Sequence, residues 1–152
     1  MKSKSSAGFS LVELLVVIAI IGILAAVGTV AYQGYVGGAK KSSAESNHAS
    51  TTKYIAAELQ KCAIGESEAM KNGTNNFDCS VDSANEVSNA AASALSDFKN
   101  PYQSTSTAVT QGSGTDVGVT YVSDDGTTIT ITTRVKDSTE TQFNLSNTVI
   151  VE

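Results

Sequence analysis

Hydrophobic residues are concentrated in one block near the N-terminus of this 152-residue chain. The first eight residues are polar and basic, and an apolar run then starts at Phe9, with Glu13 as its only charge. Residues 14–31 are uncharged and mostly apolar, close to the roughly 20 residues with which a helix crosses a bilayer. Because Lys2 and Lys4 precede this run, the positive-inside rule predicts a cytoplasmic N-terminus.

Beyond residue 31 the pattern becomes amphipathic and predicts that the helix continues into water. Side chains that repeat at spacings of three and four define one helix face turned to a core: Ala44, His48, Thr52, Ile55, Leu59 and Cys62. No proline precedes Pro101, so we predict a single helix from Phe9 to about Lys61, about 80 Å long. The bilayer needs only about 30 Å of it, and the rest is expected to be the spine of an external head. His48 has no visible second ligand and is expected to be structural.

Two cysteines, Cys62 and Cys79, flank a loop rich in turn residues after this helix. In an exported chain such a pair favours a disulfide, with two reduced, buried thiols as the alternative. The bridge closes an 18-residue loop (62 to 79) and contributes about 3 kcal/mol in the chain-entropy model. Beyond it, a capping box at Ser83–Glu86 predicts a second helix over about 83–97, which ends before Pro101.

From about residue 105 the hydrophobic period changes to two, which is typical of strands. Alternating runs at 117–121 and 129–135 are separated by a hairpin turn at 124–126, and a third strand runs from Phe143 to Val151. We expect a flexible loop at 111–115. The predicted class is therefore α+β: a long N-terminal helix, half membrane-spanning and half amphipathic, packs against the apolar face of a C-terminal antiparallel sheet. A disulfide-closed loop and a short second helix lie between them.

Charge and composition exclude several functions. Ten Lys and Arg residues against fifteen Asp and Glu residues give a net charge of -5, which argues against binding nucleic acid through bulk charge. One His and two Cys are too few for a zinc or iron–sulfur site, and no cluster of acid, base and nucleophile can be assembled. Asp124 and Asp125 supply few of the six to eight oxygens that calcium prefers, so we interpret them as a turn. We expect no enzyme activity, metal or cofactor.

Glu13 separates three interpretations of the N-terminal block. A secretory signal peptide and a generic signal anchor both leave a carboxylate at the membrane without a partner, which costs a few kcal/mol. Cleavage between Gly8 and Phe9 supplies the partner, because Phe9 then carries a free ammonium group. Glu13 lies one helical turn from that amine. It can pair with the amine of its own chain or with the Phe9 amine of a neighbouring subunit.

The segment from Gly8 to Leu15, Gly-Phe-Ser-Leu-Val-Glu-Leu-Leu, and the following Ala19–Ala26 resemble the class III signal of type IV pilins and pseudopilins. The resemblance covers about residues 1–40, the rest of the chain agrees only in architecture, and the chain is most like a type IVa major pilin. It implies the pilin fold. It also implies that a prepilin peptidase cuts after Gly8 and N-methylates Phe9, and that Glu13 pairs with the Phe9 amine of a neighbour during assembly.

This resemblance implies three regions: a leader at 1–8, a transmembrane and filament-core helix at 9–31, and a periplasmic or extracellular head at 32–152. Two features depart from the family pattern. Val30 stands where members often have a proline, so Gly22 and Gly28 mark the segment most able to stretch or unwind on packing. The disulfide of many pilins also lies nearer the C-terminus.

The function that the resemblance implies is that of a structural subunit. The prepilin of a bacterium waits in the inner membrane, is cut, and polymerises into an extracellular type IV pilus for adhesion, motility or DNA uptake. Its partners are further copies of itself, the prepilin peptidase, an inner-membrane platform protein and an assembly ATPase. The alternatives are a type II secretion pseudopilin, since residues 98–103 faintly resemble a Gly-Asn-Pro-Tyr segment of major pseudopilins, and a membrane-anchored binding module that forms no polymer.

Overall fold

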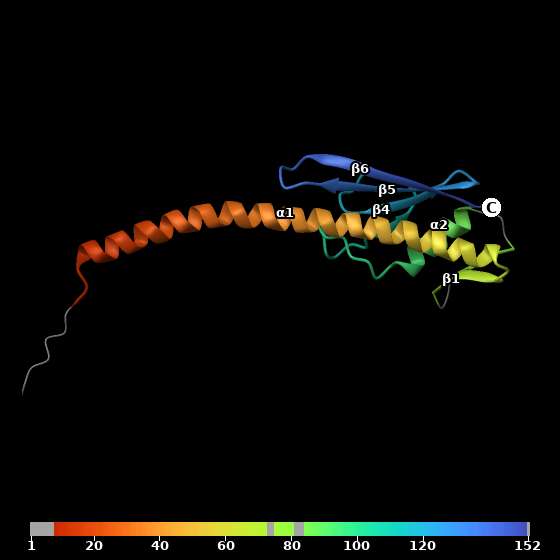
Figure 1. The fold of residues 1–152 in the computed structure, drawn as a ribbon, viewed down its shortest axis with the longest axis horizontal. Helices are drawn as coiled ribbons and strands as arrows, with labels where there is room; N and C mark the ends of the chain where they lie inside the picture. The colour runs from red at the N-terminus through yellow and green to blue at the C-terminus, as the bar shows by residue number, and fades with distance from the viewer. Residues whose placement is uncertain (1–7, 73–74, 81–83, 152) are drawn as a thin grey trace, which may run out of the picture.

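One long helix dominates the protein. The computed structural model describes residues 8–72, 75–80 and 84–151. Helix α1 (Leu11–Ala63) runs for 53 residues from the N-cap Ser10 to the C-cap Ile64. Its N-terminal half projects alone and its C-terminal half lies against the head (Figure 1). The predicted single helix is confirmed, with both ends about two residues later in the chain than expected.

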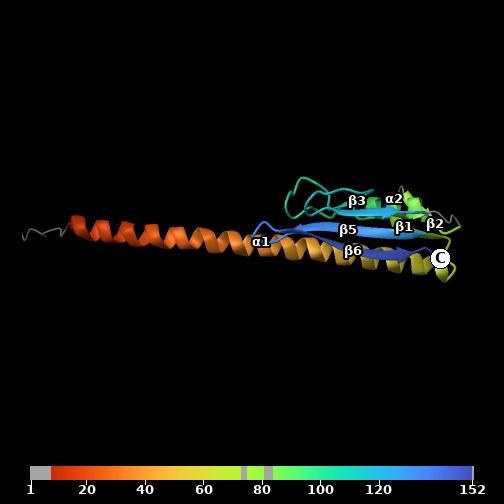
Figure 2. The same ribbon diagram turned by 90° about the horizontal axis from the view of Figure 1, so that it is seen from above.

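Four strands of the head form one sheet in the order β3-β4-β5-β6. Strands β4 (Thr120–Asp124), β5 (Thr128–Lys136) and β6 (Gln142–Ile150) are antiparallel neighbours, as the alternating pattern predicted. Every second side chain of β5 is buried, on the face that packs against α1: Ile129, Ile131, Thr133 and Val135. The strands run alongside α1 in two perpendicular views (Figures 1 and 2).

A hydrophobic core fills the space between the C-terminal half of α1, helix α2 (Ala84–Ala94) and the sheet. Ile55, on the predicted core face of α1, is fully buried. The core is completed from α2, the sheet and the segment between the cysteines: Ala69, Met70, Phe77, Val87, Ala90, Ala91, Leu95, Val109, Val122, Ile129 and Ile131. The α+β class predicted from the sequence is thereby confirmed.

The loop between the two cysteines contains regular structure that the sequence did not predict. Strands β1 (Glu68–Asn72) and β2 (Asn75–Asp78) form an antiparallel hairpin with an irregular register. Four residues of the turn-rich run 71–76 lie in the strands themselves, and residues 73–74 lie outside the described residues. Met70 and Phe77 bring the apolar surface that the hairpin needs, since both are buried in the core. Tertiary packing therefore outweighs the weak strand propensity of this polar segment.

The first predicted strand of the sheet begins later than expected. Gly118 has a φ of +80°, which L-residues disfavour, and this separates Val117 from the strand that starts at Thr120. The Asn100 side chain stabilises the kink, because its Nδ2 donates to the Val117 carbonyl at 2.9 Å. Val117 instead makes a parallel bridge with Arg134.

Strand β3 (Val109–Gln111) was also not predicted, and it pairs in parallel with β4. Its last residue, Gln111, was expected to begin a flexible loop. The following loop covers β4, since a Cβ on Gly114 would lie 2.2 Å from the Tyr121 ring. The sheet is therefore mixed, with one short parallel edge strand.

Helix α2 confirms the predicted second helix but is shorter than 83–97. After Ala94 the backbone changes to a tighter turn, in which the Phe98 amide donates to the Leu95 carbonyl three residues earlier at 3.1 Å. The predicted capping box depends on Ser83, which lies outside the described residues. Pro101 lies beyond the end of α2, as expected for a residue whose missing N–H cannot continue a helix.

Candidate processing and assembly segment

The Gly8–Phe9 peptide bond lies outside the helix. Residues 8–10 precede α1, and the Phe9 side chain is 87% exposed. A Cβ placed on Gly8 would meet no atom within 4 Å. The predicted cleavage site is therefore accessible in the single chain, and it lies close to the first turn of α1.

Glu13 has a partner in the single chain that the sequence argument overlooked. The Ser10 amide donates to Glu13 Oε2 at 2.8 Å, and the Val12 amide donates to Ser10 Oγ at 3.2 Å. Ser10 and Glu13 thus form a capping box, in which the first turn satisfies two otherwise unpaired N–H groups. The negative charge also lies at the positive end of the helix dipole.

The capping box was readable from the sequence. Ser-x-x-Glu at 10–13, directly before an apolar run, is the same pattern that predicts a helix start at 83–86. It shows that the carboxylate of the uncut chain has a hydrogen-bond partner even without a nearby cation. Glu13 therefore has a hydrogen-bond partner without cleavage, although this bond leaves its charge in place.

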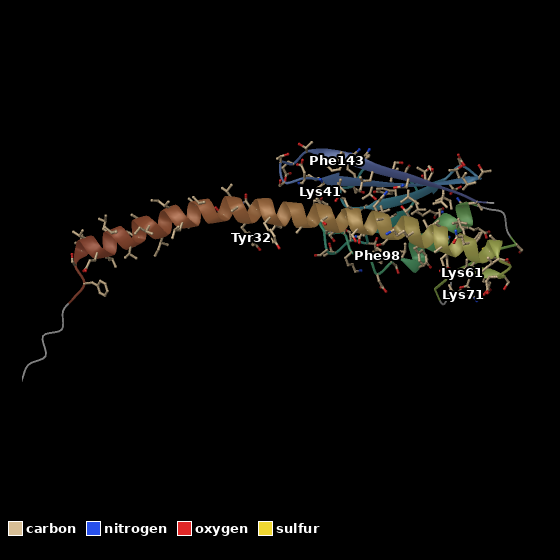
Figure 3. All side chains as sticks on the ribbon, in the orientation of Figure 1. Tyr32, Lys41, Lys61, Lys71, Phe98 and Phe143 are labelled. Carbon is tan, nitrogen blue, oxygen red and sulfur yellow. A yellow bond between two sulfur atoms is a disulfide. The ribbon has the colours of Figure 1, made fainter. Side chains whose placement is uncertain are left out.

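The N-terminal half of α1 presents apolar side chains on all sides (Figure 3). The large hydrophobic side chains from Phe9 to Tyr35 are each exposed by about half or more, so the described part of the chain leaves them uncovered. The helix is long and apolar enough to cross a membrane. Such a surface is incompatible with water over this length and indicates burial in lipid or against other chains.

Gly22 and Gly28 lie in regular helix, and no atom stands within 4 Å of a Cβ built on either. Neither glycine is therefore required by a contact within the single chain. The Thr29 hydroxyl donates to the Ala26 carbonyl at 3.1 Å, a local bond that competes mildly with the helix ladder. The expectation that this segment stretches on packing stays a prediction.

The head makes close contacts with α1 at the point where the unpacked N-terminal half of the helix meets the head. The turn between β5 and β6 packs closely against Gly37, because a Cβ built on Gly37 would lie 3.0 Å from Ser138 Cα. Lys41 Nζ lies 4.8 Å from the centroid of the Phe143 ring (Figure 3). The Thr139 hydroxyl and the amides of Thr139 and Thr141, with help from the Lys41 charge, lower the pKa of Asp137 in this turn.

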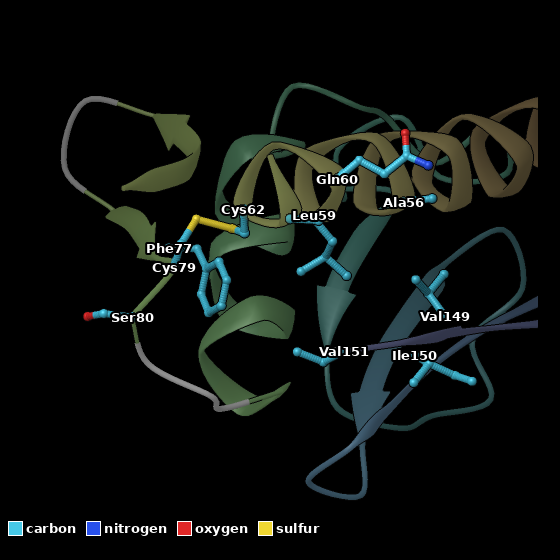
Figure 4. A pocket seen from close by; sticks show the side chains of 11 residues that line it. Ala56, Leu59, Gln60, Cys62, Phe77, Cys79, Ser80, Val149, Ile150 and Val151 are labelled. Carbon is cyan, nitrogen blue, oxygen red and sulfur yellow. A yellow bond between two sulfur atoms is a disulfide. The ribbon is translucent and has the colours of Figure 1, made fainter. Parts of the chain in front are cut away.

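The other end of the head carries the disulfide. Cys62 at the end of α1 is bonded to Cys79 after β2, with 5.3 Å between their Cα atoms. Beside it lies an open groove of about 430 Å³ between the helix end, the hairpin and the end of β6 (Figure 4). The bridge that the sequence favoured is confirmed, and the alternative of two reduced thiols is wrong for this structure.

Glu58 joins α1 to the hairpin near the disulfide. Its carboxylate accepts from the Met70 amide at 2.7 Å and from Lys61 Nζ at 2.5 Å. Burial raises the pKa of Glu58, but the two hydrogen bonds and the Lys61 charge outweigh burial and lower it. Met70 has a φ of +53°, so this bond also holds a disfavoured backbone conformation in place.

His48 is structural, as expected. It is buried, its Nδ1 lies 2.9 Å from Thr133 Oγ1, and its Nε2 lies 2.7 Å from Asn147 Oδ1. The ring therefore connects α1 to β5 and β6. In the described residues no group of three or more His, Cys, Asp or Glu side chains is placed to hold a metal. Asp125 accepts from the amides of Thr127 and Thr128 and acts as the turn residue that the sequence predicted.

A family model described as the prokaryotic N-terminal methylation motif matches residues 3–29. The motif supports the type IV pilin and pseudopilin family. Comparison with curated proteins and with solved structures gave no match. The match covers most of the predicted leader, the predicted cleavage junction and most of the apolar run, so it coincides with the segment singled out by geometry. Proteins of the pilin kind are structural rather than enzymatic.

Proposed function

We propose that this chain is a type IV pilin that polymerises into an extracellular bacterial filament. One observation supports this more than any other. A bare apolar helix starts directly after an accessible Gly-Phe bond, carries one carboxylate in its first turn, and continues without a break into the spine of a folded head. A simple membrane anchor needs neither the placed carboxylate nor an apolar rod rigidly continuous with the head.

In this proposal the prepilin lies in the inner membrane with residues 1–8 in the cytoplasm, 9–31 in the bilayer and 32–152 outside. Prepilin peptidase cuts after Gly8 and methylates Phe9. The new ammonium replaces the Ser10 amide as the partner of Glu13, in the same chain or in a neighbour. A pairing between neighbours offsets the desolvation of both ions and sets the stagger between subunits.

Assembly exchanges lipid for protein around residues 9–31 of each helix, whose large apolar side chains are exposed in the single chain. Lipid tails are as apolar as these side chains, so this exchange alone contributes little free energy. Assembly is therefore driven by other contributions: helix packing, the Phe9–Glu13 ion pair, and a platform protein with its ATPase. The heads then lie outside the helical core, and loops such as 112–116 contact the surroundings.

A type II secretion pseudopilin is the second candidate, because the same signal serves both. The Asn-Pro-Tyr residues at 100–102 form a structural clamp here. The Tyr102 amide donates to Asn100 Oδ1 at 2.8 Å and the Tyr102 hydroxyl donates to the Lys136 carbonyl at 2.6 Å. The location of the fibres separates the two functions: a pilus extends from the cell, and a pseudopilus stays in the periplasm at native expression.

Two measurements test the proposal. Intact mass of the chain purified from native membranes and sheared fibres is expected to begin at Phe9 with one added methyl group. Electron microscopy with an antibody to the head is expected to label surface fibres. A native product that keeps residues 1–8, or labelled membranes without fibres, would contradict the filament and favour an anchored binding module.

A further inference from the structure

Strand β6 is a free edge of the four-stranded sheet, and it is long for an edge strand. Its nine residues pair one-to-one with β5, from Gln142 opposite Lys136 to Ile150 opposite Thr128. Apart from this ladder, the main chain of β6 makes no hydrogen bond within the part of the chain that the structure describes. Alternate N–H and C=O groups of β6 therefore point outward without a protein partner.

Proteins usually protect such an edge with a lysine, a proline, a bulge or a short strand. Strand β6 has none of these over its nine residues. The opposite edge, β3, is three residues long and packs against α2. The hairpin β1–β2 carries Glu68, Lys71 and Asp78. Among the described strands, β6 is thus the long and uncharged edge. All its side chains are exposed except Leu145 and Val149, which are half-buried.

We infer that β6 pairs with β6 of a second copy of this chain, antiparallel and centred on Ser146. A surface that meets its own copy must not place like charges opposite one another, and β6 is uncharged in a chain of net charge -5. The pairing places Phe143 opposite Val149 on the face towards α1, an aromatic and β-branched pair. On the outer face it places Asn144 opposite Thr148.

The remaining pairs of this register are compatible with it. Ser146 lies opposite itself, and the two other pairs, 142 with 150 and 145 with 147, each join one polar and one apolar side chain. No pair contains a charge or a proline. The pairing gives each outward N–H and C=O group of β6 a partner and joins two four-stranded sheets into one.

This contact has two-fold symmetry, so it joins two copies and then stops. It cannot by itself extend a helical filament, whose contacts are head-to-tail. Strands β5 and β6 run alongside α1, so the pairing sets the two long helices antiparallel (Figures 1 and 2). In the filament proposed above, the same contact links two filaments side by side. That last step rests on the proposed function, whereas the pairing itself does not.

Disulfide trapping tests the pairing in the full chain in detergent micelles, where no filament is needed. Directly opposite residues lie about 4.5–5.5 Å apart between Cα atoms, within the range of a disulfide. Ser146→Cys is expected to give at least tenfold more oxidised dimer than the control Thr132→Cys. Thr132 is the register partner of Ser146 on β5, and in the paired sheets its two copies stand three strands apart, about 14 Å. Equal dimer from the two variants, or none from Ser146→Cys in a chain that melts like the parent, overturns the inference.

A charge exchange supplies a second test that does not use cysteine. Ser146→Lys is expected to lower dimerisation at least tenfold, because the two lysines lie opposite one another, while Thr132→Lys leaves it within twofold. Mixing Ser146→Lys with Ser146→Glu is expected to restore pairing between the two variants. Failure of this rescue, with both variants folded, overturns the inference. If fibres form, side-by-side bundling in electron micrographs is expected to fall for Ser146→Lys and to stay close to the parent for Thr132→Lys. If no fibres form, the filament proposal fails and the micelle result still decides the pairing.

Discussion

Replacing Glu13 with glutamine separates the two roles that the structure and the proposed function give to this residue. In the single chain Glu13 Oε2 accepts from the Ser10 amide at 2.8 Å, and a glutamine oxygen can accept the same bond, since the capping box tolerates either residue. The charge, however, is lost. We therefore expect Glu13→Gln to insert, to be cleaved and to accumulate in the membrane like the parent, while polymerisation fails.

The expected size of the defect follows from the environment of the lost pair. Removing one partner of a fully buried ion pair costs about 3–5 kcal/mol, because the other charge stays buried without compensation. If the pair keeps some water, about 1 kcal/mol is lost. Since about 1.4 kcal/mol is a factor of ten in an equilibrium constant, fibre yield is expected to fall at least about fivefold. Loss of a cap alone costs about 1 kcal/mol and acts on the helix start rather than on assembly.

The assay is quantitative immunoblotting of sheared fibres against membrane-retained chain, with intact mass to confirm cleavage. Glu45→Gln is the matched control, because Glu45 is a partly exposed glutamate on the half of α1 that lies against the head, and it pairs with Lys41 only at 3.7 Å. Ser10→Ala tests the cap separately and is expected to change fibre yield less than Glu13→Gln does. Parental fibre yield from a cleaved Glu13→Gln chain would show that the charge of Glu13 has no part in assembly.

Three further predictions concern the head. Gly118→Ala is expected to lower the free energy of unfolding by more than about 1 kcal/mol, because the new Cβ would lie 2.2 Å from Asn100 Oδ1 and the residue has a φ of +80°; thermal denaturation measures this. Replacing Cys62 and Cys79 together with serine is expected to cost about 3 kcal/mol in chemical denaturation, since the bridge closes a loop with a sequence separation of 17. The lowered pKa of Glu58 contributes stability that is present above its unfolded pKa of about 4.3 and is lost as pH falls through the lower folded pKa. Glu58→Gln removes this contribution, so it is expected to flatten the pH dependence of the melting temperature below about pH 4.5.

Each of these predictions has a control within the chain. Gly38→Ala lies in α1, where a new Cβ meets nothing within 4 Å, and is expected to leave stability unchanged or to raise it by about 0.5–1 kcal/mol. Equal effects of the two glycine substitutions contradict the close-approach argument. Reduction of the parent with a mild thiol should reproduce the effect of the serine pair. Glu66→Gln, an exposed neighbour, should keep the parental pH dependence.

Much of the fold could be predicted because it depends on local period. The spacing of three and four around Ile55, and the lack of proline before residue 101, determine the long helix. The alternation from Ile129 to Val135 determines β5, and the turn at 124–126 joins it to β4. The candidate assembly site is also a local motif, since Gly8, Phe9 and Glu13 are near neighbours along the chain, and the family model matches the segment that contains them. Its capping partner, Ser10, was missed although the motif is local.

What the sequence did not determine depends on contacts between distant segments. Strand β3 is three residues long and exists because Val109 lies beside Thr120 in a parallel pair, which no local pattern signals. The hairpin in the disulfide loop forms because Met70 and Phe77 have a core to enter. Periodicity placed His48 on the inner face of the helix, but only the packed structure chose Thr133 as its hydrogen-bond partner, 85 residues away. Hydrophobic period is a property of one segment, whereas pairing and register are properties of two, and the second segment is selected by packing.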